Sequence, residues 1–179
     1  MLIRGLLILT LLATFFASGC SVRTPLAEQG MLERQQVERV TALEKLFRGL
    51  GDRVDADESK ALARDSFTFA YRLSERYELV WPPLWHNTLV NVGLKERGLC
   101  YQWADDMLAH VKEGGYHSFD FYLGVSGQGT LWEHNTLVVS AKGEPFEQGV
   151  VLDPWRDSGE LYFAKVSEDE KYQWQLRDG

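Results

Sequence analysis

The chain has 179 residues, of which 45% are hydrophobic and 25% are charged. This composition is typical of a folded protein with one hydrophobic core, and it argues against a disordered chain or several large domains. The 19 basic and 26 acidic residues give a net charge of −7, so the phosphate backbone of a nucleic acid is not an expected partner.

Residues 1–19 have the layout of an export signal. Arg4 precedes an almost unbroken apolar run over 5–16, and small residues follow it. These small residues end on Cys20, and the segment resembles the lipobox of bacterial lipoproteins. The resemblance implies cleavage before Cys20, acylation of this residue, and an outer-membrane anchor facing the periplasm, because Ser21 rather than Asp follows it. The alternative is an N-terminal anchor that is not cleaved.

The remainder of the chain is predicted to form a short tether and one domain. Residues 20–30 are polar, contain one proline and are interpreted as a lipidated tether. Residues 31–179 are predicted to form a single domain, with a helical part over 31–80 and a second part over 81–179 that carries the chemistry.

Apolar residues at spacings of three and four predict two helices in the first part of this domain. The first extends from Met31 to Leu50 and ends near Gly51. Asp55 and Glu58 have the spacing of a capping box at the start of the second. The inner face of the second helix is predicted to carry Leu62, Ser66, Phe69, Leu73 and Tyr77.

Residues 81–83, Trp-Pro-Pro, interrupt the helical pattern, and the pattern changes again after Gly115. A short helix is predicted over 87–95 and a longer one from Leu99 to Lys112. Alternating residues then predict strands over 119–125, 134–141, 150–153, 161–166 and 172–176. Because helices precede strands, the predicted class is α+β with an antiparallel sheet.

Cys100 is predicted to lie at the start of the longer helix, directly after Gly98 and Leu99. The partial positive charge and free N–H groups of a helix N-terminus favour a thiolate and can stabilise an oxyanion. If Cys20 carries lipid, Cys100 has no intramolecular disulfide partner, and a free thiol in an oxidising compartment is a liability unless it is buried or used. The alternative is a small hydrophobic side chain in the core.

His134 and Asp153 lie on consecutive predicted strands. A hairpin centred between Gly143 and Glu144 places them opposite each other. A loop centred one residue later moves the pairing by two residues and keeps both side chains on one face. A carboxylate beside a histidine fixes its tautomer and stabilises the imidazolium. The alternative is a core histidine that is bonded to the backbone.

Three motifs in this order resemble the transglutaminase-like branch of the papain-type cysteine peptidase fold. They are Gly-Leu-Cys-Tyr-Gln-Trp-Ala over 98–104, His-Asn-Thr-Leu-Val-Val over 134–139, and Val-Leu-Asp-Pro-Trp over 151–155. The resemblance covers residues 87–166. It implies a papain-like core in which Cys100 is the nucleophile, His134 the base and Asp153 the orienting acid. The chain departs from the family at residues 134–136, where the family often has His-Ala-Trp, and this departure bears on the substrate class.

Other residues are candidates for supporting roles. Asn87, Asn91 and Gln102 are the candidates for a second oxyanion donor, and the asparagines are favoured because Gln102 lies inside a predicted helix. Trp132 and Trp155 each lie two residues from a predicted triad member and are candidates for the walls of a substrate groove. No Cys/His spacing fits a zinc site, so no metal or cofactor is expected.

These predictions favour a membrane-anchored cysteine hydrolase or acyltransferase that acts on an amide or peptide bond, with a peptide or protein as substrate. Hydrolysis and transamidation share their first half, so the residues do not separate them. The alternatives are a catalytically inactive transglutaminase-like binding module that holds a peptide or cell-envelope partner, and a structural envelope protein whose helical part docks onto a larger assembly.

Overall fold

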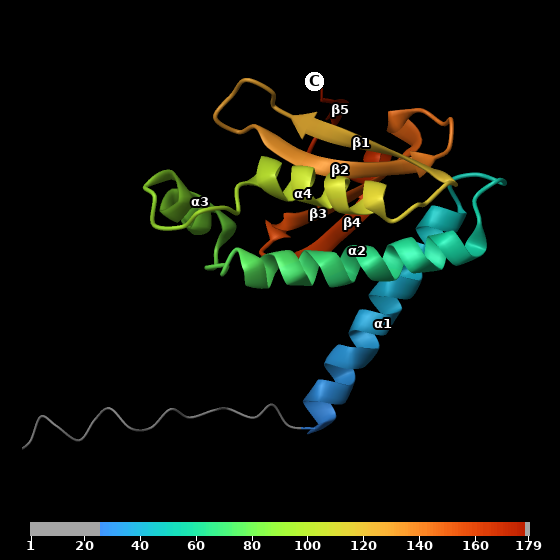
Figure 1. Ribbon diagram of the computed structural model, residues 1–179, viewed down its shortest axis with the longest axis horizontal. Coiled ribbons are helices and arrows are strands. Elements are labelled where there is room, and N and C mark those ends of the chain that lie inside the picture. Colours follow the sequence, from blue (N-terminus) through green and yellow to red (C-terminus); the bar gives the residue numbers. More distant parts are fainter. Residues whose placement is uncertain (1–25, 178–179) are drawn as a thin grey trace, which may run out of the picture. The chain divides into compact units, whose positions relative to one another are not determined.

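The computed structural model describes residues 26–177, and within them the fold is α+β, with four helices followed by a five-stranded antiparallel sheet (Figure 1). The predicted class is therefore confirmed. The chain divides into two compact units after Gln35, and the fold below is that of the second unit. Helix α1 (Leu26–Arg48) begins before the predicted Met31, so residues 26–30, which the sequence assigns to the tether, are helical. Residues 1–25, including Cys20, lie outside the described residues.

Helix α2 (Ala56–Arg76) begins as the sequence predicts. The carboxylate of Asp55 accepts the backbone N–H groups of Asp57 and Glu58, both at 2.9 Å, and so caps the helix. Glu58 does not complete a capping box but instead accepts the N–H groups of His117 and Ser118, which precede the sheet. The predicted inner-face residues of α2 are all buried: Leu62, Ser66, Phe69, Leu73 and Tyr77.

The bonds of Glu58 make a prediction about acid stability. Burial acts to raise the pKa of Glu58, but the bonds from His117 and Ser118 outweigh it and lower the pKa. The carboxylate therefore stabilises the fold above its unfolded-state pKa, and this contribution is lost as the pH falls through the lower folded-state pKa. Glu58→Gln should reduce the free energy of unfolding by roughly 1 kcal/mol at neutral pH, after allowance for solvent exposure.

Urea unfolding from about pH 7 to about pH 3 measures this difference, which should shrink as the pH falls. Glu38→Gln is the matched control, because Glu38 is exposed on α1. A difference between Glu58→Gln and wild type that stays constant across this range would contradict the prediction.

Two further helices lead to the sheet. Helix α3 (Pro83–Asn91) begins four residues before the predicted start and ends before the predicted Lys95. Pro83 occupies the first turn, where a proline needs no N–H partner and its fixed φ suits the helix. Helix α4 (Cys100–Glu113) matches its prediction closely and ends at Gly114.

The sheet has the strand order β4-β3-β2-β1-β5. Its strands are β1 (Phe119–Ser126), β2 (His134–Ala141), β3 (Val150–Asp157), β4 (Glu160–Lys165) and β5 (Gln175–Leu176). The first four agree with prediction in place and type, although β3 continues beyond the predicted end. The fifth has two residues in place of the predicted five, because residues 172–174 pack around the site described below and do not pair.

Strand β2 is the centre of the core, and all of its residues are buried. Leu137 and Val139 face a hydrophobic cluster that includes Trp103 and Met107 of α4. Val138 belongs to a second cluster on the opposite face. Both faces of β2 are therefore covered, and α4 packs against the strand (Figure 1).

Candidate active site

A tight turn before α4 fixes the position of Cys100. The side-chain oxygen of Gln102 accepts the N–H groups of Gly98 and Leu99 at 2.8 and 3.0 Å, and the indole N–H of Trp103 donates to the carbonyl of Gly98 at 3.2 Å. Cys100 is the first residue of the helix and is partly exposed. It therefore lies where free helical N–H groups can stabilise negative charge on the sulfur or on a bound oxygen.

The register of β2 and β3 brings His134 and Asp153 together. Leu137 pairs with Leu152 and Val139 with Val150, so the connecting loop is centred one residue later than the symmetric hairpin. This is the second of the two predicted arrangements, and it leaves the side chains of His134 and Asp153 on one face of the sheet. Nε2 of His134 and Oδ2 of Asp153 are 2.6 Å apart, and their side chains are only 3% and 1% exposed.

The second ring nitrogen of His134, Nδ1, is not used by Asp153. Nδ1 is buried and has no hydrogen-bond partner among the described residues. The thiol of Cys100 donates instead to the carbonyl oxygen of Glu133, with a sulfur–oxygen distance of 3.9 Å. Burial disfavours the imidazolium, but the bond to Asp153 and the proximity of Cys100 outweigh this cost and raise the pKa of His134 to about 9. This favours a protonated imidazole beside the sulfur.

Aromatic rings enclose His134. The ring centroids of Trp155, Tyr172 and Trp174 lie 4.7, 4.5 and 5.4 Å from that of the imidazole. These rings exclude water and so strengthen the interaction between His134 and Asp153. Tyr172 and Trp174 were not among the predicted site residues, because they lie in a predicted fifth strand outside the three motifs.

Arg156 and Asp169 are further members of the site that the sequence analysis missed. Nε of Arg156 donates to Oδ2 of Asp153 at 3.1 Å, and Nη2 donates to Oδ2 of Asp169 at 2.6 Å. A basic residue three positions after Asp153 was a usable signal for Arg156. No local pattern marks Asp169 as its partner.

A pocket of about 510 Å³ contains Cys100 and His134. Its walls come from the start of α3, the loop that leads into β2, the end of β3 and the segment before β5. Both predicted groove residues, Trp132 and Trp155, line it. Trp132 and Leu131 are 81% and 100% exposed, so the pocket opens beside an apolar surface.

The contacts of the three candidate oxyanion donors differ. Asn87 lines the pocket, and its side-chain oxygen accepts the indole N–H of Trp155 at 3.0 Å, which leaves the amide NH₂ as a donor. The oxygen of Gln102 is used in the turn before Cys100, and Asn91 is exposed at the end of α3. Neither of these residues lines the pocket, so Asn87 is the favoured donor.

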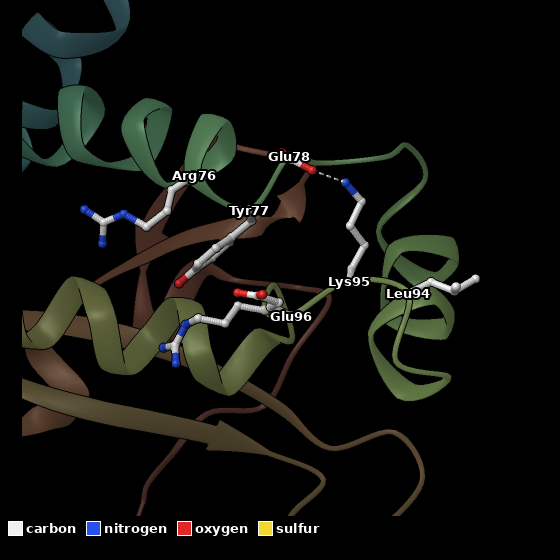
Figure 2. Close-up of a pocket in the computed structure, with 7 residues that line it drawn as sticks. Arg76, Tyr77, Glu78, Leu94, Lys95 and Glu96 are labelled. Carbon is white, nitrogen blue, oxygen red and sulfur yellow. Dashed lines mark hydrogen bonds and ion pairs between the residues drawn. The ribbon is translucent and has the colours of Figure 1, made fainter.

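A second pocket, of about 450 Å³, lies between the end of α2 and the loop before α4 (Figure 2). Its charged groups are largely paired: Lys95 bonds to Glu78 at 2.7 Å, and Arg97 bonds to Asp106 at 2.7 Å. The hydroxyl of Tyr77 also donates to Asp106. Burial together with Asp106 raises the pKa of Tyr77 well above its ordinary value, so this hydroxyl is a poor nucleophile. The loop that leads to Cys100 forms part of the wall of this pocket.

The structure also bears on metals and membranes, within residues 26–177. No group of three or more His, Cys, Asp or Glu side chains in this part of the chain is placed to hold a metal ion. Of the helices described there, none combines the length and apolar character needed to cross a bilayer.

Comparison with known proteins gave no match to a family model, a curated protein or a solved structure.

Proposed function

We propose that the chain is a cysteine hydrolase or acyltransferase of the transglutaminase-like kind, which acts on an amide or peptide bond. The observation that carries the proposal is the pocket that joins a partly exposed Cys100 at a helix N-terminus to the buried His134–Asp153 pair. From residues 1–20 we further propose that it is a lipoprotein of the outer membrane facing the periplasm.

In the proposed reaction, Nδ1 of His134 already holds the proton of the Cys100 thiol, and the sulfur attacks the carbonyl carbon as a thiolate. The new S–C bond leaves negative charge on the carbonyl oxygen, which the backbone N–H of Cys100 and the amide of Asn87 stabilise. The C–N bond then breaks as His134 returns the proton to the departing amine. Water or a second amine resolves the thioester and restores the thiol. Asp153 orients His134 throughout.

The pocket indicates which acyl groups fit. Its entrance is formed by Leu84, Leu131 and Trp132, all more than half exposed. Such surface is costly to leave in water and favours an acyl donor with a bulky apolar or aromatic group near the carbonyl. Trp132 is the largest of these side chains and is therefore the one to test.

A pair of p-nitrophenyl esters tests both the reaction and this preference. The 3-phenylpropionyl ester should react with the protein faster than the acetyl ester. Trp132→Ala should lower kcat/KM for the aromatic ester about 10-fold, which corresponds to the loss of one partly buried apolar contact, and should change the acetyl ester much less.

Cys100→Ala is the control, because p-nitrophenol release that persists in this variant arises elsewhere on the protein. Mass spectrometry of the quenched reaction should show the acyl group on Cys100. Release that does not depend on Cys100 would contradict the proposed function. Equal losses for both esters in Trp132→Ala would contradict the acyl preference alone.

A binding module without catalysis is the second candidate. It is favoured by the bond from the Cys100 thiol to Glu133, since Nδ1 of His134 then has no hydrogen-bond partner within residues 26–177. In this case the apolar entrance of the pocket would hold a peptide segment. Absence of acyl transfer in the ester assay, with saturable binding of an apolar peptide that Trp132→Ala weakens, would identify this function.

A further inference from the structure

Arg156 connects the candidate triad to the C-terminal segment 169–174. Its backbone N–H and Nε donate to the two oxygens of Asp153 at 3.2 and 3.1 Å. Its Nη1 and Nη2 donate to the two oxygens of Asp169 at 3.2 and 2.6 Å. One guanidinium is therefore shared by two carboxylates, and Oδ2 of Asp153 bonds to both Arg156 and His134.

This connection is almost completely removed from water. The side chains of Arg156, Asp153 and Asp169 are 6%, 1% and 0% exposed. Asp169 also accepts the indole N–H of Trp174 at 2.8 Å and the backbone N–H of Lys171 at 3.1 Å. In such surroundings, removing one charge leaves its partner uncompensated and acts on every neighbouring ionisable group.

The same connection positions the rings around His134. The guanidinium of Arg156 lies 3.6 Å from the ring centroid of Tyr162 and 4.8 Å from that of Tyr172. Tyr172 in turn packs on His134, and Trp174 both packs on His134 and donates to Asp169. The bonds between Asp169 and Arg156 therefore also hold the aromatic rings of Tyr172 and Trp174 in place around His134.

Ionisable side chains lie near His134 on the residue before β2, on α4, on β3 and on the C-terminal segment. The exposed Glu133 precedes His134 and uses its carboxylate in bonds to Gly129 and Asn135. The other ionisable groups near His134 come from α4, from β3 and from the C-terminal segment, and they are Cys100, Asp153, Arg156, Asp169, Lys171 and Tyr172. With His134 as an imidazolium, the four buried charges cancel in two pairs, His134 with Asp153 and Arg156 with Asp169. A thiolate at the partly exposed Cys100 adds one negative charge.

We propose that Arg156 is a positioning residue that holds Asp153 in place to bond His134. Together with the opposite charge of Asp169, it also sets the pH range in which the Cys100–His134 pair reacts. The inference rests on the proposed function. Arg156 disfavours protonation of the pair, and Asp169 favours it. Removing one of them should therefore shift the pH dependence in the direction opposite to removing the other.

The test is the pH profile of Cys100 alkylation by iodoacetamide in the full chain, measured at Cys100 by peptide mass spectrometry. Arg156→Met should move the midpoint of the acid limb up by about one pH unit, and Asp169→Asn should move it down by about one unit. The double variant should return to within a few tenths of a unit of wild type, because the charge of the site is restored. Shifts in the same direction, or no shift where wild-type Cys100 reacts faster than an ordinary thiol, would overturn the proposal.

Arg156→Lys is the conservative control. It keeps the charge but loses the bonds to both carboxylates, so it should slow labelling and leave the midpoint near that of wild type. Near-UV circular dichroism establishes that each variant is folded. If the single variants do not fold, the double variant and Arg156→Lys decide: a midpoint displaced by a full unit in either would overturn the proposal.

A second measurement separates this inference from the proposed function. In a Cys100→Ser background, the titration of His134 followed by NMR should move up with Arg156→Met and down with Asp169→Asn. If His134 shifts in this way while wild-type Cys100 labels like an ordinary thiol, the positioning by Arg156 stands and the proposed function is wrong. If Cys100 is reactive and His134 does not shift, the positioning role is wrong and the function stands.

Discussion

Iodoacetamide should label Cys100 rapidly at about pH 6 in the wild-type chain and at least about 10-fold more slowly in His134→Ala. A cysteine with an ordinary pKa of about 8.5 is only about 0.3% ionised at pH 6. A sulfur that has passed its proton to His134 reacts faster than such a thiol, although the lower nucleophilicity of an ion-paired thiolate offsets part of this advantage. The expected difference arises because the structure favours a protonated His134 next to the sulfur.

His117→Ala is the matched control, because His117 is an exposed loop residue remote in sequence from the site. It should label like wild type. The urea-unfolded chain gives the rate of an ordinary thiol. Labelling of the folded wild type at or below the unfolded rate, with no response to His134→Ala, would contradict the nucleophile assignment and favour the binding module.

Gly98→Ala should destabilise the fold by about 3 kcal/mol and should also slow labelling of Cys100. Gly98 has a φ of +126°, and a Cβ there would lie 2.2 Å from Nε2 of His86. His86 cannot move aside, because it is buried and bonds to the carbonyl of Arg97 at 2.8 Å and the N–H of Val80 at 3.3 Å. The collision must instead displace the turn that positions Cys100.

Gly93→Ala separates this collision from the strain of a positive φ. Gly93 has a φ of +77°, and a Cβ there would have no heavy atom within 4 Å. Gly93→Ala should lower the free energy of unfolding by about 1 kcal/mol and leave the rate of Cys100 labelling unchanged. Urea unfolding measures the loss of stability in each variant, and labelling at about pH 6 measures the reactivity of Cys100. Equal costs for the two substitutions would show that His86 and the turn do not restrict this position.

Local patterns predicted most of the secondary structure correctly, and they failed where local and tertiary requirements differ. The sequence predicts a start of α1 at Met31 because the residues before it are polar and contain a proline, yet residues 26–30 are helical. The start of α3 was placed after the prolines because a proline was interpreted as an interruption, although Pro83 suits a first helical turn. The predicted fifth strand is short because residues 172–174 are used around His134.

The three candidate catalytic residues could be found from the sequence for a simple reason. The position of Cys100 at a helix start depends on its neighbours, and the shared face of His134 and Asp153 depends only on the two-residue period of a strand. A shift of the loop by one residue preserved that face, so the pairing was predicted without an exact register.

The sequence by itself determined the α+β class, the places of the helices and the first four strands, and the three residues whose local settings favour acyl-transfer chemistry. Only the tertiary structure decided that Cys100 and His134 share a pocket, that Asn87 and not Gln102 faces it, and that Arg156 joins Asp153 to Asp169. The physical reason is that local periodicity reports which face a side chain occupies. Contacts between α4, the loops and the C-terminal segment depend instead on how distant parts of the chain pack together.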